Sequence, residues 1–351
     1  GELPMSAAAP PRASRIEQFA RRTVPFVISA ALLTYVFGRI DIRIALDHLT
    51  ADVVLRFMAP LALFSVVTLL IEAQCLHRVI GANPNDARPL SRFTAARIKA
   101  ACYLLGVLNY AIGAAGLSVL VRRRTGASIA VAVGMVFLVS LFDIGSVLAW
   151  VALGGVWLQT ETYGLRIGLV GLMIAAIAAG FVFLRLPIAL GPLDSIRDLP
   201  LFRAARDAKL TLLFEIGVLR LLFVGCFVLL VRGLFWSFEV DASWGELAFK
   251  VGIMLVVSAL PIAAGGLGTG QIVFVELFSG AASEPRLLAM SVVFSMAMIV
   301  SRALIGLLFA SEFAREALAA TREEQREELA RASSAGESAA EEASEEPSSD
   351  V

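Results

Sequence analysis

The stretch 261–270, "PIAAGGLGTG", places four glycines behind a proline in an otherwise apolar part of the chain. Proline removes a backbone donor and ends a helix, and glycine permits positive φ and close approach to bare backbone. A helix that begins after this turn points its free N–H groups and its positive dipole end into the protein. Such an end binds anions, phosphate among them. Tight helix packing through small residues is the alternative interpretation.

The glycine turn is therefore predicted to bind the phosphate of a lipid headgroup, together with the half-helix 271–278. A second and weaker pattern, "NYAIGAAGLS", is followed by three arginines. Its "GAAG" also matches a small-xxx-small packing motif, so the turn and the packing interpretations both stay open there. The predicted substrate-binding residues are Pro261, Gly265, Gly266, Gly268, Gln271, Gly113, Gly116, Arg122, Arg220 and Glu276.

Several charged residues fall within apolar segments. A charge near the bilayer centre costs about 2.5–3.5 kcal/mol on insertion scales, so it is normally paired or functional. Asp143 and Arg302 lie deepest and are predicted to form an intramembrane pair. Arg220 is predicted to meet a lipid phosphate through its guanidinium, which can bind bidentately. Structural ion pairs between helices are the alternative, and Glu72, near a segment end, is expected to be solvated.

Composition places the chain in the membrane. It is 58% hydrophobic with a mean hydropathy of +0.80, whereas soluble domains are about 45–50% apolar. Its three cysteines lie in or beside apolar segments without a CxxC pair, and its two histidines lie at segment ends. These features predict no disulfide framework, no metal site and no cofactor. They also make a histidine-based catalytic centre improbable, so the chain is not expected to be an enzyme.

Eight apolar segments are long enough to be candidate spans. They are 23–38, 57–76, 98–121, 128–153, 165–186, 210–231, 248–279 and 287–310. Positively charged loops stay cytoplasmic, and eight full crossings would give a poor inside bias of 16 basic residues against 12. If 98–121 and 248–279 each return to the side they entered, the bias becomes 21 against seven.

The expected fold is thus an all-α polytopic membrane protein, with about six spanning helices and two glycine-broken re-entrant segments. Non-helical backbone at membrane depth is tolerated only inside protein or beside water. The loop 122–126, the linker 191–209 and both termini are predicted to face the cytoplasm. The linker's "DLPLFRAARDAKL" is predicted to form an interfacial helix on that leaflet.

Two motifs resemble the flippase-like membrane region of lysylphosphatidylglycerol synthases and of stand-alone proteins built from that region. The first begins at "NYAIGAAGLS" and runs to the aspartate of the next helix; its matching positions are Gly113, Gly116, Arg122, Gly126, Ser128 and Asp143. The second is "LPIAAGGLGTGQ", with Pro261, Gly265, Gly266 and Gly268. Many members of the family end this second turn with an acidic residue, where this chain has Gln271. The likeness covers roughly residues 20–310.

The resemblance implies a domain organisation without the synthase domain of that family. A basic cytoplasmic N-terminus covers 1–22 and a flippase-like membrane domain covers 23–311. The remaining 312–351 hold four basic and twelve acidic residues, and are predicted to be a cytoplasmic tail, first helical and then disordered. The location it implies is the cytoplasmic (inner) membrane of a bacterium or archaeon.

The function implied is translocation of a phospholipid, glycolipid or polyprenyl-linked lipid between leaflets. The alternatives are a non-transporting scaffold for a lipid-modifying enzyme and, with less support, a membrane-embedded lipid transferase. The partners expected are a membrane lipid and, for a scaffold, a lipid-synthesising enzyme or a glycosyltransferase. No partnership with nucleic acid is expected.

Overall fold

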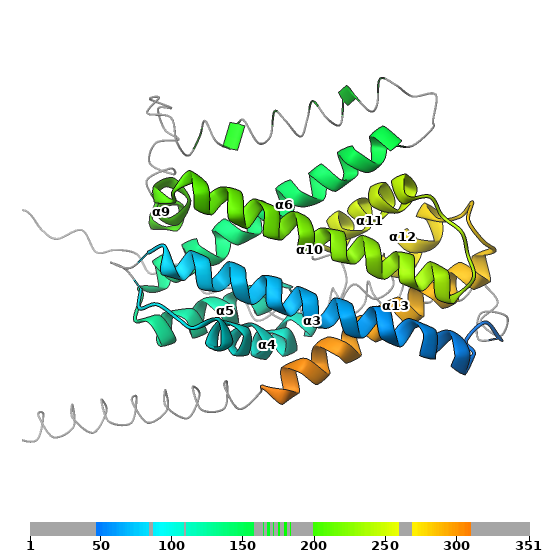
Figure 1. The fold of residues 1–351 in the computed structure, drawn as a ribbon, viewed down its shortest axis with the longest axis horizontal. Coiled ribbons are helices and arrows are strands. Elements are labelled where there is room, and N and C mark those ends of the chain that lie inside the picture. Colours follow the sequence, from blue (N-terminus) through cyan, green and yellow to red (C-terminus); the bar gives the residue numbers. More distant parts are fainter. Residues whose placement is uncertain are drawn as a thin grey trace, which may run out of the picture.

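The computed structural model describes residues 47–83, 87–108, 110–157, separate positions between 164 and 183, 199–259 and 269–309. In this part of the chain every regular element is an α-helix (Figure 1). The predicted span 23–38 and the tail 312–351 lie outside the described residues, and the predicted span 165–186 lies largely outside them.

Four helices are long and apolar enough to cross a membrane. They are α3 (Ala51–Gly81), α6 (Ile129–Trp157), α10 (Leu210–Ser237) and α13 (Glu284–Leu308). With 25 to 31 residues each, they exceed the roughly 20 residues that a hydrocarbon core of about 30 Å requires. They contain or nearly coincide with four of the predicted spans, 57–76, 128–153, 210–231 and 287–310, which confirms the all-α membrane class.

The outer faces of these helices are apolar. Leu63 of α3 is 67% exposed, Phe214 of α10 is 76% exposed and Leu308 of α13 is 77% exposed. In water such side chains, repeated along several long helices, would form a large unprotected apolar surface. In a bilayer they face acyl chains, so the exposed leucines and phenylalanines are consistent with a protein that lies in lipid.

Helices α3 and α10 lie side by side and run in opposite directions (Figure 1). At one end Arg56 bonds Glu239 at 2.9 Å, and at the other Arg78 bonds Glu215 at 2.6 Å. Ion pairs at both ends thus hold α3 and α10 in register.

Helix α6 runs parallel to α10, because Gly217 faces Phe142 while Gly225, further along, faces Trp150.

The segment 98–121 folds into a hairpin of two shorter helices, α4 (Arg92–Leu108) and α5 (Tyr110–Thr125). The backbone N–H of Arg88 donates to the carbonyl of Thr125 at 2.9 Å, which joins the open ends of the hairpin. Near its closed end, a Cβ on Gly113 would lie 2.9 Å from the Cα of Gly106.

Helix α4 ends at Leu108 and α5 begins at Tyr110, so the change from one helix to the next comes before the glycines that were predicted to form it. Gly113 and Gly116 lie inside α5, so the prediction of a turn at these two residues is wrong. Gly113 instead serves the close packing of α4 on α5, because a side chain there would collide with the backbone of Gly106. Small residues allow helices in membranes to approach in this way.

The segment 248–279 also contains two short helices, α11 (Trp244–Ala259) and α12 (Thr269–Leu277). They contact each other, and the Lys250 ammonium of α11 lies 5.2 Å from the ring centroid of Phe278, just after α12. The connection 260–268 lies outside the described residues, and with it Pro261, Gly265, Gly266 and Gly268. A phosphate-binding turn at these residues remains a prediction.

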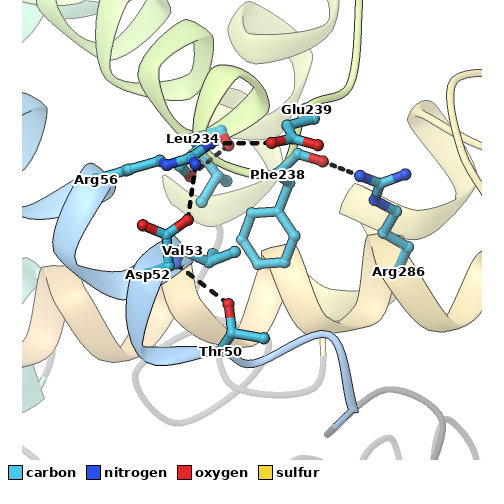
Figure 2. A network of polar contacts seen from close by, with 9 residues as sticks. Thr50, Asp52, Val53, Arg56, Leu234, Phe238, Glu239 and Arg286 are labelled. Carbon is cyan, nitrogen blue, oxygen red and sulfur yellow. Dashed lines mark hydrogen bonds and ion pairs between the residues drawn. The ribbon is translucent and has the colours of Figure 1, made fainter.

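Three tryptophans mark one end of the bundle, which we call the tryptophan end: Trp157, Trp236 and Trp244, each more than half exposed. Figure 2 shows the polar network there, in which Arg56 contacts Asp52 and Glu239. Arg286 at the start of α13 donates to the carbonyl of Phe238. These contacts tie the beginnings of α3 and α13 to the end of α10.

The opposite end, the basic end, is defined by Arg78, Arg122, Arg123, Arg206 and Lys209, which lie at the ends of α3, α5 and α9 and before α10. Helix α9 (Pro200–Asp207) lies within the predicted interfacial segment. Its Ala204 and Ala205 are buried, and its Phe202 packs edge-on against Phe137 of α6. The predicted amphipathic helix is therefore present, with its apolar face on the bundle.

Candidate functional site: a polar layer between two hydrophobic cores

The bundle has two hydrophobic cores, one toward each end. In α3, the core at the tryptophan end stops at Phe64 and the core at the basic end begins at Ala73. In α10, the basic-end core stops at Ile216 and the other core begins at Phe227. The interval between them, midway along both helices, contains polar and charged side chains.

We call this group the polar layer. Five helices supply it: α3, α4, α6, α10 and α13. Its members are Glu72, Lys99, Tyr103, Asp143, Arg220 and Arg302. Because α3, α6, α10 and α13 are the candidate spans, most of these charges belong to apolar helices, where each must be compensated.

Glu72 of α3 is the centre of the first half of the layer. Its carboxylate accepts from the Lys99 ammonium at 3.0 Å and from the Tyr103 hydroxyl. The Glu72 residue is only 9% exposed, so the expectation that it would be solvated is wrong. Two α4 donors one helical turn apart hold this carboxylate, because residues at i and i+4 share a helix face.

The second half of the layer is an ion pair between Asp143 of α6 and Arg220 of α10. Arg220 is 3% exposed, and its guanidinium also lies 3.8 Å from the ring centroid of Phe223. Its Nε has no hydrogen-bond partner among the described residues. The predicted pair of Asp143 with Arg302 is therefore wrong, because α10 and not α13 brings the cation to Asp143.

Arg302 of α13 lies on the other side of the layer, with its guanidinium 5.8 Å from the ring centroid of Tyr103. It lines a small recess with Ser65, Thr68, Tyr103 and Phe223, and the recess has room for about one water molecule. The recess sits between α3, α4, α10 and α13, at the level where the two hydrophobic cores separate.

The two halves form one electrostatic unit. Glu72 lies close enough to Arg220 for their charges to interact, and Tyr103, which donates to Glu72, has the Arg302 guanidinium beside its ring. The six side chains hold two carboxylates and three cations, so the formal charge of the layer is one positive. A site of this charge, partly shielded from solvent, favours an anion over a cation.

The other predicted binding residues are scattered. Gln271, at the start of α12, is 2% exposed and donates to the Ser295 hydroxyl at 3.1 Å. Glu276 is exposed on α12, and Arg122 is exposed at the end of α5. Neither belongs to the polar layer. Arg220, predicted to bind phosphate, is already paired with Asp143.

The loop between α5 and α6, part of the first family-like motif, has a structural role. Gly126 has a φ of +74° and its N–H donates to the carbonyl of Arg122 at 2.9 Å, so it closes α5. Ser128 then accepts from the N–H of Val131 at 3.3 Å and caps α6. These residues make a tight connection at the basic end rather than a ligand site.

Sequence reasoning missed Lys99 and Tyr103. Lys99 stands at the edge of segment 98–121, beside a basic loop, and Tyr103 carries no charge. The signal that could have found them is their spacing, four residues apart on one helix of a segment predicted to enter the membrane. A lysine and a tyrosine on one helix face can together hold a carboxylate from a neighbouring helix.

Comparisons with known proteins add no family to this description. No protein-family model matches the chain, and no curated protein matches it. The likeness of 109–143 and 260–271 to the flippase-like family therefore stays a prediction. What the structure shows is a set of paired charges, Glu72 with Lys99 and Asp143 with Arg220, and a small recess lined by Arg302, within an apolar helical bundle.

Proposed function

We propose that this protein moves an amphiphilic lipid between the leaflets of a membrane. The observation that carries the proposal is the polar layer, in which five helices bring six polar side chains together midway along long apolar helices. Charges at such depth are costly and typically mark substrate or ion pathways. A lipid headgroup that crosses between leaflets needs polar contacts at this level, while its chains remain against the apolar outer faces.

Two helical hairpins support this proposal. The α4–α5 hairpin has its open end at the basic end of the bundle, where Arg88 contacts Thr125. The α11–α12 hairpin has its open end at the tryptophan end, where Gly245 packs on Trp157. Each is too short for two full crossings. We propose that both are re-entrant and that they approach the polar layer from opposite membrane faces.

The proposed orientation places the basic end in the cytoplasm and the tryptophan end at the outer interface. It follows from the positive-inside rule and from the preference of tryptophan for membrane interfaces. Ser128 and Ser243 test it as a matched pair, because each is exposed and each caps a helix through its hydroxyl, α6 and α11 respectively.

We expect a membrane-impermeant maleimide to label Ser243→Cys in intact cells and to label Ser128→Cys only after the cells are opened. The native cysteines are a weak background, because Cys75 and Cys102 are buried and Cys226 is partly buried. Labelling of Ser128→Cys from outside, with Ser243→Cys protected, would reverse the proposed orientation.

The translocation proposal is tested by reconstituting the protein in vesicles that carry fluorescent phospholipid and measuring how fast the inner-leaflet label becomes accessible to dithionite. Wild-type vesicles should exchange label faster than empty vesicles. In Asp143→Leu/Arg220→Met, flux should fall by roughly tenfold or more, the equivalent of about 1.4 kcal/mol of barrier. The double variant removes the charges of the pair together, so the protein can stay folded.

The matched control is Arg203→Gln/Asp207→Asn, which removes an exposed ion pair from α9, 3.6 Å long and remote from the layer. It should leave flux within about twofold of wild type, since exposed pairs contribute about 0–1 kcal/mol. If the folded layer double variant transports at the wild-type rate, the pair is only structural. If no lipid class moves faster with wild-type protein than without it, the translocator proposal fails and the scaffold alternative gains support.

A further inference from the structure

The cations of the polar layer are not equally compensated. Lys99 has the Glu72 carboxylate at 3.0 Å, and Arg220 has the Asp143 carboxylate. Arg302 forms no ion pair with any described carboxylate; its guanidinium lies over the face of Tyr103, 5.8 Å from the ring centroid. Cation–π contact stabilises a guanidinium but does not neutralise it.

The position of Arg302 makes this excess charge accessible to a ligand. Its side chain is partly exposed and lines the recess between α3, α4, α10 and α13. The recess has room for about one water molecule, so a larger group meets Arg302 at the mouth of the recess rather than inside it. An arginine at this depth, without a carboxylate partner in the described part of the chain, favours an anionic ligand.

The walls of the recess are suited to an anion that is attached to something apolar. Ser65 and Thr68 donate their hydroxyls to carbonyls of their own helix, at 2.8 and 2.7 Å, and Phe223 supplies an aromatic wall. The guanidinium therefore provides the charged donors, while the neighbouring exposed faces of α3 and α13 are apolar, as Val66 and Leu304 illustrate.

We infer that Arg302, at the mouth of its recess, binds the phosphate of a lipid headgroup with one net negative charge, such as a phosphatidylglycerol. This inference rests on the proposed function and names its substrate class. The single positive charge of the polar layer matches the single negative charge of a phosphodiester. A zwitterionic headgroup cancels that charge internally, and a lysyl-phosphatidylglycerol, with two ammonium groups, reverses it, so both should bind more weakly.

Binding is tested on detergent-purified protein by titrating short-chain phosphatidylglycerol and following the melting temperature and the intrinsic fluorescence. Short-chain phosphatidylcholine and lysyl-phosphatidylglycerol serve as the zwitterionic and cationic comparisons. Phosphatidylglycerol should bind wild-type protein roughly tenfold more tightly than either of them. Arg302→Gln should lose that preference, because a hydrogen bond to a charged group is worth roughly a factor of ten or more.

Two further variants separate charge from packing. Arg302→Lys retains the cation and should recover part of the preference for phosphatidylglycerol, without the bidentate geometry. Arg123→Gln removes an exposed arginine from the end of α5 and should bind like wild type. The melting temperature without lipid shows whether each variant is folded, and a misfolded Arg302→Gln is replaced by Arg302→Met for the same comparison.

The headgroup without its chains, glycerophosphoglycerol, distinguishes a lipid ligand from a soluble one. If it binds as tightly as the lipid, the recess serves a soluble phosphodiester and the lipid assignment is overturned. A folded Arg302→Gln protein that retains the preference for phosphatidylglycerol overturns the site, as does a wild-type preference for the cationic lipid.

The flux assay keeps this inference separate from the proposed function. With fluorescent phosphatidylglycerol, Arg302→Gln should slow movement at least as much as it weakens binding, whereas phosphatidylcholine movement should change little. If binding depends on Arg302 but the protein moves no lipid, the binding site is supported and the proposed translocation is contradicted. If lipid movement depends neither on headgroup charge nor on Arg302, translocation is supported and the binding site is contradicted.

Discussion

Replacing Asp143 with leucine is expected to lower the free energy of unfolding by about 3–5 kcal/mol. The change leaves the Arg220 guanidinium, 3% exposed, without the carboxylate that compensates it. Arg220→Met should cost a similar amount, because it leaves Asp143 as the unpaired charge. The double variant, Asp143→Leu/Arg220→Met, should be close to wild type, since removing both charges also removes the cost of burying them.

This double-mutant cycle is measured on detergent-purified protein, by chemical unfolding followed with tryptophan fluorescence. Asp207→Asn is the matched control: it removes a carboxylate that pairs at the surface with Arg203 and Arg206. Each such pair should contribute no more than about 1 kcal/mol. Additive losses in the double variant would mean that Asp143 and Arg220 do not compensate each other. The cycle also supplies the folded, charge-free protein that the flux assay needs.

Gly154→Ala is expected to destabilise the protein by about 1–3 kcal/mol or more through overpacking. A Cβ at Gly154 of α6 would lie 2.3 Å from the backbone N of Phe249 and 2.7 Å from the carbonyl O of Gly245. Both neighbours are backbone atoms of α11, so no side chain can turn away, and the two helices would have to separate. Gly252 of α11 faces α6 as well, but there the nearest atom is a side-chain methyl, Val151 Cγ2, 2.4 Å from its Cβ position.

Gly145→Ala provides the control on the same helix. Apart from the nearby backbone of α6 itself, no atom of the described residues lies within 4 Å of its Cβ position. The change should therefore be neutral or stabilise α6 by about 0.5–1 kcal/mol, the usual gain of alanine over glycine in a helix. Melting temperatures of the two variants in one detergent make the comparison. Equal melting temperatures would show that α6 and α11 do not pack as closely as their backbones indicate.

The hydrophobic pattern of the chain determined the class of the protein and the position of its long helices. Segments 57–76, 128–153, 210–231 and 287–310 each lie within or nearly coincide with α3, α6, α10 and α13. This prediction succeeds because a stretch of roughly 20 apolar residues spans the hydrocarbon core as a helix. In lipid, only a helix satisfies all the backbone N–H and C=O groups of a single segment. The sequence also predicted helix α9, because its basic and apolar residues recur with helical periodicity.

Local backbone rules located the break in 98–121 only approximately. Glycine marks both turns and close helix contacts, and the sequence alone does not separate the two uses. The structure separates them at Gly113, because the neighbouring Gly106 leaves no space for a Cβ and the residue remains helical. The connection between the two helices comes a few residues earlier, after α4 ends at Leu108.

The partners of the buried charges were decided by tertiary structure. The sequence identified Asp143, Arg220 and Arg302 as charges that need compensation, because each interrupts an apolar segment. It could not say which helices are neighbours, and Asp143 meets Arg220 only because α6 packs along α10 in parallel. Glu72 is buried for the same kind of reason: the α4 face that carries Lys99 and Tyr103 covers it. Hydropathy is a property of a single segment and can be read from the sequence. Whether a buried charge is compensated depends on its distance to an opposite charge on another helix, and that distance is set only when the helices pack.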